Sequence, residues 1–501
     1  MTQAPCKTEC EALIAMAHAI LSHLDAGQGN IQIKIRPLTS WLEKAQELLK
    51  SPTLETIEGE RTLEGLSLGL RHNWLRCVHQ RSDSYLMSPP LNQHRFLPDG
   101  QKMHFPYDRW LKPEVLQERL LKTELPPTGW RKQALVFSSG MSALTTFMQA
   151  YKAFAHRWWP QLKGVKHLYW WGGYFEITKS LHLLCDRTFV GHKPARQQNL
   201  WTSIRSEQPD LLLIEPISAS FELDVFDLDS FVQAWKARTS KRPTVIIVDT
   251  SLTAKHFCVS ELCSALEFDP PALVVEIRSG LKLDQQGFEL SNVGLMELWA
   301  PESDTIVQDV VHTLQVSRTT LGAGLSYNEV AALHAPFFLD PDAVQQHSEN
   351  VFAANRDLAQ ALHACLRTDA GLFSDIFHPS LGTAKDKPWA VAPFVNIRYR
   401  PNSNNDRAFL RHVIEDEAAN RRLCFWTGTS FGFRSHRLEM GVSQDRKFDT
   451  FRVAMGSRPG PSKDGVIKLL TELNGYENFQ ALRTAYPHIK DDRAEQDEAE
   501  T

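Results

Sequence analysis

Short apolar runs alternate with longer segments of helical periodicity through the middle of the chain. Runs such as Leu211–Ile214 are typical of buried strands, and segments such as Met141–Phe154 are typical of amphipathic helices. Strands that alternate with helices predict crossover connections and a mostly parallel sheet. The expected strands are Ala134–Phe137, His167–Trp170, Leu211–Ile214, Thr244–Val248 and Leu273–Ile277, and the expected helices are Met141–Phe154, Tyr174–Leu184 and Leu228–Ala237.

The pattern changes on both sides of this central region. Helical spacing at Cys10–Leu24 and Leu38–Leu49 predicts a helical extension before it, and Ser88–Phe105, rich in Pro, Asn, Gln and His, predicts a loop. The region after it combines one long helix with strand-like runs, at Val344–Leu366, Trp389–Tyr399 and Phe451–Met455. The sequence therefore predicts an α/β protein with additional parts at both ends.

We expect four regions along the chain. They are a helical N-terminal extension (1–95), a large domain (96–330), a smaller C-terminal α+β domain (331–480) and a disordered acidic tail (481–501). The last prediction rests on the residues from Lys490 onward, which are polar, acidic and without aromatic side chains.

Composition excludes several classes of function. Fifty-five basic and 59 acidic residues give a formal net charge of -4, so no basic excess is available to neutralise nucleic-acid phosphates. The 8 cysteines are scattered without CxxC pairs, and we expect reduced thiols and no metal site. The first residues lack the basic start and apolar stretch of a signal peptide, and no apolar run approaches the ~20 residues of a membrane span. We therefore expect a cytoplasmic protein that binds neither nucleic acid nor membrane.

The segment Leu135–Leu144 contains a candidate phosphate site. An apolar run ends in Ser138, Ser139 and Gly140 and leads directly into a helix. Such a junction presents backbone N–H groups and the positive end of the helix dipole, both of which favour a phosphate. A Ser-Gly turn before a helix is also common without a ligand, so this motif alone leaves both interpretations open.

Two further candidates lie at strand ends. Asp249 ends an apolar run, at the edge of an α/β sheet where ligands bind, and could pair with a protonated ring nitrogen or simply cap a helix. Lys282 follows the apolar run Val274–Ile277 and a Ser-Gly pair. A lysine in apolar surroundings loses its proton more easily, as an amine must before it forms a Schiff base. The alternative is a surface lysine that extends its amine into water.

The order of these motifs resembles the cystathionine γ-synthase, cystathionine γ-lyase and methionine γ-lyase family of pyridoxal-phosphate (PLP) enzymes. That resemblance implies fold type I, with a mostly parallel seven-stranded sheet between helices, and PLP as the cofactor. It implies that Lys282 holds the cofactor, that Asp249 keeps its ring nitrogen protonated and that Tyr174 stacks on the ring. The phosphate would be bound by Ser139, Gly140, Met141, Ser279 and, from the neighbouring subunit, Tyr107 and Arg109.

Two further matches lie near the end of the chain. Ser430-Phe-Gly resembles the Ser-Leu-Gly of the family, and Arg452 lies in a segment like the one whose arginine binds the substrate carboxylate. The resemblance implies a homodimer or homotetramer whose active sites are shared between subunits. It also implies that Lys282 moves protons while Tyr107 or Tyr174 assists the leaving group.

The chain departs from the family pattern at several positions. Leu281 replaces the hydroxyl residue usually found before the lysine. The asparagine that the family places beside the phenolic oxygen of the cofactor is missing, and Ser218 could substitute for it. The first hundred residues have no counterpart in the family. These differences indicate a divergent branch and leave the substrate open.

The resemblance implies γ- or β-elimination or replacement at the side chain of an L-amino acid, in specialised amino-acid biosynthesis. The named reaction we favour is γ-elimination from a γ-halogenated unsaturated amino acid to an alkyne amino acid. The alternatives are a replacement or annulation with an adenosylmethionine-derived intermediate, an aminotransferase, and a non-catalytic regulatory protein of this fold.

Overall fold

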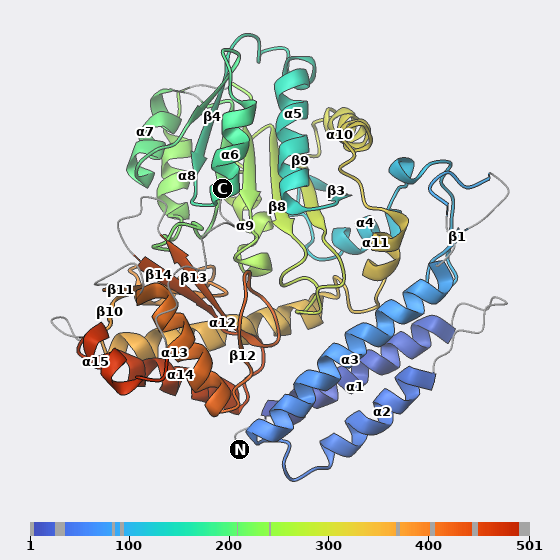
Figure 1. Ribbon diagram of the computed structural model, residues 1–501. Helices are drawn as coiled ribbons and strands as arrows, with labels where there is room; N and C mark the ends of the chain where they lie inside the picture. The colour runs from blue at the N-terminus through green and yellow to red at the C-terminus, as the bar shows by residue number, and fades with distance from the viewer. Residues whose placement is uncertain are drawn as a thin grey trace.

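A computed structural model describes residues 5–25, 36–82, 86–90, 95–207, 209–239, 242–366, 371–400, 406–442 and 449–489. A helical extension, a large sheet domain and a smaller sheet domain follow one another along the chain (Figure 1). None of the described helices combines the length and the apolar character that crossing a membrane requires.

The large domain is built on a seven-stranded sheet of order β3-β9-β8-β7-β6-β4-β5. Strand β9 is antiparallel to both of its neighbours, and every other pairing is parallel. This arrangement confirms the predicted mostly parallel sheet. Its strands are β3 (Trp130–Phe137), β4 (Lys166–Trp171), β5 (Phe189–His192), β6 (Leu211–Ile214), β7 (Val245–Asp249), β8 (Leu273–Ser279) and β9 (Gly294–Pro301).

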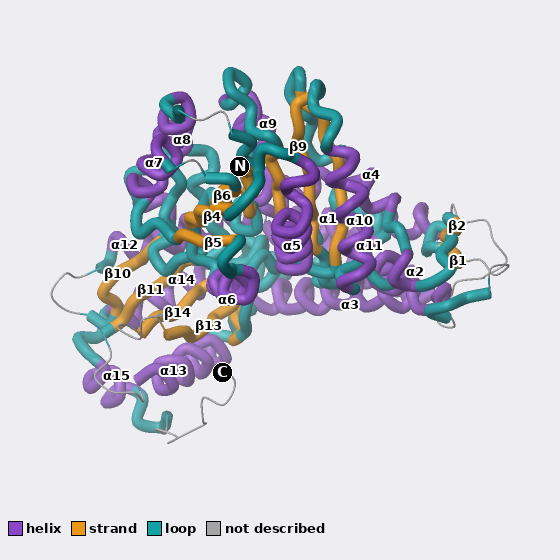
Figure 2. The backbone as a smooth tube through the Cα atoms, turned by 90° about the horizontal axis from the view of Figure 1, so that it is seen from above, coloured by secondary structure: helices purple, strands orange, loops and turns teal. Residues whose placement is uncertain are grey.

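Helices cover both faces of this sheet because successive strand residues point to opposite faces (Figure 2). In β7, Val245 and Ile247 pack with one set of helices, whereas Ile246 and Val248 pack with the other. The first set is α5 (Gly140–Trp158), α6 (Phe175–Leu184) and α10 (Val307–Leu321), and the second is α7 (Gln197–Ser206), α8 (Leu228–Lys236) and α9 (Val259–Ala265). The 3-10 helix η2 (Ala254–His256) lies between β7 and α9 in the chain.

The smaller domain has a five-stranded sheet of order β10-β11-β14-β13-β12. Its strands are β10 (Phe373–Phe377), β11 (Val395–Tyr399), β12 (Phe425–Thr427), β13 (His436–Val442) and β14 (Asp449–Ala454). Its helices are α12 (Pro341–Ala364), η3 (Pro379–Leu381), α13 (Asp406–Asn420), α14 (Pro461–Asn474) and α15 (Phe479–Ala485). Only the second half of the expected strand at Trp389–Tyr399 is a strand.

Helix α15 occupies part of the region that we assigned to a disordered tail from residue 481. Its Phe479 and Leu482 are buried in the core of the smaller domain, which stabilises the helix. The structured chain therefore extends past residue 481, and residues 490–501 lie outside the described residues.

The N-terminal extension contains three helices, α1 (Pro5–Asp25), α2 (Arg36–Leu49) and α3 (Ile57–Ser82), which lie side by side (Figure 1). They share an apolar core with α4 (Glu114–Leu121) and α11 (Tyr327–Leu333) of the chain that follows. The predicted loop at Ser88–Phe105 includes a short hairpin, β1 (Arg95–Phe96) and β2 (Lys102–Met103). The extension is therefore packed against the rest of the protein through apolar side chains.

Candidate functional site

The phosphate motif lies where β3 leads into α5. Ser139 caps the helix, and its Oγ accepts a hydrogen bond from the Ser142 backbone N–H at 3.0 Å. A Cβ on Gly140 would lie 3.1 Å from the backbone nitrogen of Ser279 and 3.3 Å from its Cα. The glycine therefore permits the helix N-terminus and the end of β8 to meet. The structure thus brings Ser139, Gly140, Met141 and Ser279 together, as their predicted shared role requires.

Lys282 lies in the loop after β8, packed against the smaller domain. Its Nζ is 5.1 Å from the centre of the Phe431 ring, and Gly432 packs against its backbone. Burial lowers the pKa of Lys282 and nearby Arg452 lowers it further, although Asp249 and Glu176 act in the opposite direction. This amine therefore loses its proton more readily than one in water, as expected of a nucleophile.

Asp249 ends β7 next to this lysine. Its Oδ1 accepts a hydrogen bond from the Ser251 N–H at 2.9 Å, and burial raises the pKa of its carboxyl group. Ser251 Oγ in turn accepts from the Ser279 N–H at 3.0 Å, which links the ends of β7 and β8. A buried carboxylate whose pKa is raised by burial is stabilised by a cation placed beside it.

A second buried carboxylate, Glu215 after β6, has a role that we did not predict. Its oxygens accept hydrogen bonds from the N–H groups of Ala219 at 2.7 Å, Gly173 at 2.9 Å and Tyr174 at 3.2 Å. Burial and the nearby Asp249 raise the pKa of Glu215 to about 7. Glu215 thereby holds the segment that positions Tyr174. The available signal was a carboxylate at the end of an apolar run, the same signal that identified Asp249.

Tyr174 lies directly before α6, and its hydroxyl donates to Glu176 Oε2 at 2.7 Å. Burial raises the pKa of Tyr174, and the carboxylates of Glu176, Asp249 and Glu215 add to that effect. The tyrosine therefore keeps its proton at neutral pH and can act as a donor.

Arg452 lies on β14 of the smaller domain and is the predicted ligand of the substrate carboxylate. Its guanidinium donates to Glu439 Oε2 at 3.2 Å and to Asn396 Oδ1 at 3.4 Å, and lies 4.0 Å from the centre of the Phe394 ring. The positive charge of Arg452 lowers the pKa of Lys282. Ser430, the other predicted substrate residue, directly precedes Phe431 and has a φ of 71°. Such a φ is uncommon for a residue other than glycine and fits a loop held by its surroundings.

Ser220, two residues after Ser218, is a second candidate for the role that we predicted for Ser218. Ser218 Oγ accepts a hydrogen bond from the Ser220 N–H at 3.1 Å. Ser220 Oγ is buried and has no hydrogen-bond partner among the described residues. A Cβ on Gly173 would lie 1.9 Å from the Ser220 backbone nitrogen, so these two segments are in close contact. Ser220 is therefore a second candidate for the polar contact that we assigned to Ser218.

Tyr107 and Arg109 lie apart from these contacts, at the 3-10 helix η1 (Asp108–Trp110). The Arg109 guanidinium lies 5.0 Å from the centre of the Tyr107 ring, and that ring meets Trp110 edge-on. Arg109 and Trp110 are both exposed. The cross-subunit role of this pair stays a prediction.

A buried group of charged residues, the β8–β9 charge cluster, supports the site from within the sheet. Lys255 Nζ lies 2.7 Å from Glu276 and 2.6 Å from Glu297, and Arg278 lies 2.9 and 3.0 Å from the same two carboxylates. Arg278 Nε also contacts Asp284 Oδ1 at 3.1 Å. Since Arg278 and Asp284 flank Lys282 in the sequence, their ion pair fixes the loop that carries the lysine. Charged residues inside apolar strands were the only signal of this cluster in the sequence.

No family model matches the chain, and no curated protein matches it. Solved structures do match. A methionine γ-lyase from Micromonospora echinospora aligns with a TM-score of 0.52 at 15% identity, covering 80% of this chain and 99% of that one. Cystathionine γ-lyase from yeast gives a TM-score of 0.52 at 15% identity, with coverage of 80% and 98%.

A third structure is a putative O-acetylhomoserine (thiol)-lyase from Campylobacter jejuni that contains a pyridoxyl-lysine phosphate. It aligns with a TM-score of 0.51 at 14% identity, covering 74% of this chain and 87% of that one. These likenesses confirm the predicted fold, which is fold type I of the PLP enzymes.

Proposed function

We propose that this protein is a PLP-dependent enzyme that eliminates or replaces a group on the side chain of an L-amino acid. The observation that carries the proposal is the position of Lys282. Its buried amine, with a lowered pKa, lies near the buried carboxylate of Asp249. Lys282 lies in the loop after β8, and the end of β8 meets the N-terminus of α5 at Gly140.

The residues present fit PLP. The contact between Gly140 and Ser279 forms a backbone-lined junction at the positive end of α5, which suits the phosphate. Asp249 would pair with a protonated ring nitrogen, and the unpartnered Ser220 hydroxyl is available to a polar group of the ring. When bound, the cofactor accepts the electrons left at the substrate's α-carbon.

The protein supplies the proton transfers and the orientation. Lys282 Nζ, once unprotonated, can accept the proton from the substrate α-carbon and, after it has released that proton, can accept one from the β-carbon. Arg452 would bind the α-carboxylate by a bidentate pair, with Asn396 and Glu439 orienting its guanidinium. The protonated Tyr174 hydroxyl, held by Glu176, would assist the departure of a side-chain group.

Tyr107 and Arg109 would complete each site from a neighbouring subunit, in a homodimer or homotetramer. Support comes from the exposure of Arg109 and from its contact with the ring of Tyr107 at 5.0 Å. An exposed cation at such a position suits a phosphate presented by another chain.

The test is the visible absorbance of the purified full-length protein after addition of PLP. We expect a band from lysine-bound cofactor in the wild type and in Lys179→Ala, an exposed lysine on α6, and its loss in Lys282→Ala. A wild-type protein that gives no such band would contradict the proposal.

Amino acids that perturb this band would identify the substrate. γ-Substituted amino acids test elimination and replacement, and a γ-halogenated unsaturated amino acid tests the alkyne-forming reaction. Turnover that only exchanges the amino group with a keto acid would instead indicate an aminotransferase.

A further inference from the structure

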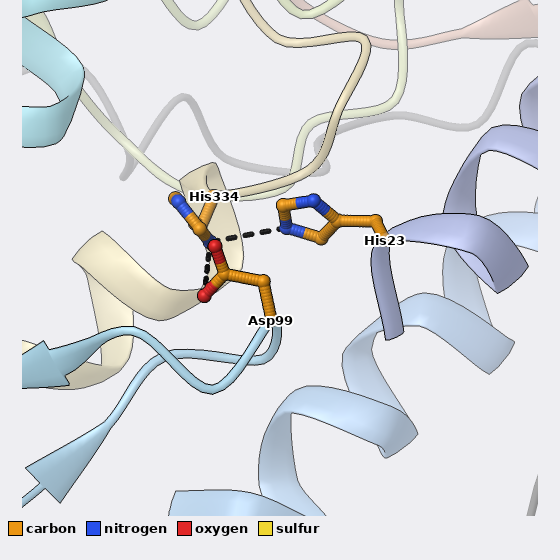
Figure 3. A group of neighbouring side chains, drawn as sticks. All are labelled: His23, Asp99 and His334. Atoms are coloured by element: carbon orange, nitrogen blue, oxygen red, sulfur yellow. Dashed lines mark hydrogen bonds and ion pairs between the residues drawn. The ribbon is translucent and has the colours of Figure 1, made fainter. Parts of the chain in front are cut away.

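Three side chains from distant parts of the chain meet beside the N-terminal extension (Figure 3). His23 comes from the last turn of α1, Asp99 from the turn between β1 and β2, and His334 from the residue that ends α11. His23 Nε2 lies 3.1 Å from His334 Nδ1, and Asp99 Oδ1 lies 3.7 Å from the same nitrogen. One potential ligand atom from each residue lies within 4.8 Å of the others.

These separations suit a tetrahedral metal ion. Ligand atoms ~2.0–2.1 Å from a tetrahedral Zn²⁺ lie about 3.4 Å from one another. The distances of 3.1 and 3.7 Å fall on either side of that value. The third pair, His23 and Asp99, lies within 4.8 Å. Side-chain rotations that bring these two groups closer would place all three on one ion and leave a fourth position for water.

The chemistry of the three groups also suits a transition metal. A set of two imidazoles and one carboxylate is preferred by Zn²⁺ and its neighbours. It suits Mg²⁺ or Ca²⁺ poorly, because those ions take oxygen ligands and two of these three ligands are nitrogens.

The surrounding structure holds His334 in place. Trp74 Nε1 donates to the Ala332 carbonyl at 2.7 Å, and Arg119 donates to the Ala335 carbonyl at 2.7 Å. These bonds fix the backbone on both sides of the histidine. The Arg119 guanidinium also interacts electrostatically with Asp99, so a metal must compete with it for the carboxylate.

We propose that His23, Asp99 and His334 bind one Zn²⁺-like ion that fastens the N-terminal extension to the large domain. The ion would join three elements that are separated by tens to hundreds of residues, and it would hold α1 against α11. This site is independent of the PLP chemistry proposed above.

The experiment measures binding of Zn²⁺ and Co²⁺ to the full-length protein, by calorimetry for zinc and by visible absorbance for cobalt. The variants are His23→Gln and Asp99→Asn, with His18→Gln as the control because His18 is an exposed histidine on the same helix. We expect one ion per wild-type chain and a tetrahedral cobalt spectrum, both retained in His18→Gln. Affinity should fall at least tenfold in each ligand variant, since loss of an outer contact alone costs about 10–100-fold.

A second measurement follows the thermal unfolding of the same proteins with and without Zn²⁺. Zinc should raise the melting temperature of the wild type and of His18→Gln, and should raise it less in His23→Gln. Two results would overturn the proposal: no binding of either ion to the wild type, or equal binding to the wild type and to both ligand variants. Either result would mean that the three residues contact one another without binding a metal ion.

Discussion

At the scale of single residues, the candidate site depends on how burial changes protonation. The same desolvation lowers the pKa of Lys282 and raises that of Asp249 and Glu215, because it disfavours the charged form in each case. An amine that is more readily deprotonated favours nucleophilic chemistry, and carboxylates whose charged form is disfavoured by burial are stabilised by a bound cation. A cationic cofactor ring beside Asp249 would therefore stabilise the charged form of this carboxylate, which burial disfavours in the cofactor-free protein.

The raised pKa of Glu215 should make the stability of the cofactor-free protein depend on pH. Its pKa of about 7 in the folded state, against an ordinary value of 4.5, means that the folded state binds more protons between those values. Its contribution to the free energy of unfolding should therefore fall as pH rises from about 5 to 8, by on the order of 2–3 kcal/mol at most. Urea unfolding at several pH values should show the wild type losing stability relative to Glu215→Gln over this range. Parallel curves for the two proteins would contradict the assigned pKa.

At the scale of secondary-structure elements, the central strands combine apolar packing with buried charge. Strands β8 and β9 each carry a glutamate, Glu276 and Glu297, whose side chains are 0% and 1% exposed. Ion pairs with Lys255 and Arg278 compensate the cost of burying them. The charge cluster therefore links these two strands next to the loop that carries Lys282.

Removal of one cation should destabilise this cluster strongly. Lys255→Met leaves Glu276 and Glu297 with fewer partners, and we expect a loss of about 3–5 kcal/mol in the free energy of unfolding, measured with urea. The control is Arg422→Gln, which breaks a pair with Glu58 in which both side chains are 62% exposed and should cost only about 0–1 kcal/mol. Equal losses in the two variants would show that Lys255 does not compensate buried charge.

At the scale of the whole molecule, the N-terminal extension is joined to both domains. Its apolar core includes residues of α11, and its Glu9 binds Arg458 at 2.8 Å and Arg434 at 3.2 Å near the smaller domain. Both arginines are buried, so these are contacts of the protein interior. The extension thus contributes to the stability of the chain that holds the candidate site.

Substitution of Glu9 tests this integration. Glu9→Gln would leave two buried guanidinium groups short of a carboxylate, with an expected loss of about 3–5 kcal/mol in the free energy of unfolding. Glu11→Gln, at an exposed position of the same helix, should change it by less than about 0.5 kcal/mol. If Glu9→Gln released the extension to proteolysis without changing the unfolding of the rest, the extension would be an independent unit.

The proposed oligomer predicts complementation between defective chains. Chains with Lys282→Ala and chains with Arg109→Ala should each be inactive alone. If Arg109 acts across subunits, random mixing into dimers should restore about a quarter of the wild-type activity, in one site of each mixed dimer. Activity that stays at the sum of the two single variants would place Arg109 in its own subunit's site.

Features that depend on local pattern could be predicted from the sequence. Apolar runs and helical spacing predicted β3, β4, β6, β7 and β8 and the helices α5, α6 and α8, because burial of one strand or one helix face leaves a periodic signature. The order of Ser139, Asp249 and Lys282 likewise identified the strand ends that form the candidate site.

Contacts between distant residues were fixed only by folding. Strand β9 was not predicted, and the burial of its Glu297 depends on Lys132, Lys255 and Arg278, which come from other parts of the chain. The meeting of His23, Asp99 and His334 has no counterpart in sequence spacing, since folding alone brings three elements together. The local sequence pattern reflects the structural preference of each residue. The residues that become its neighbours in space are set by the path of the whole chain.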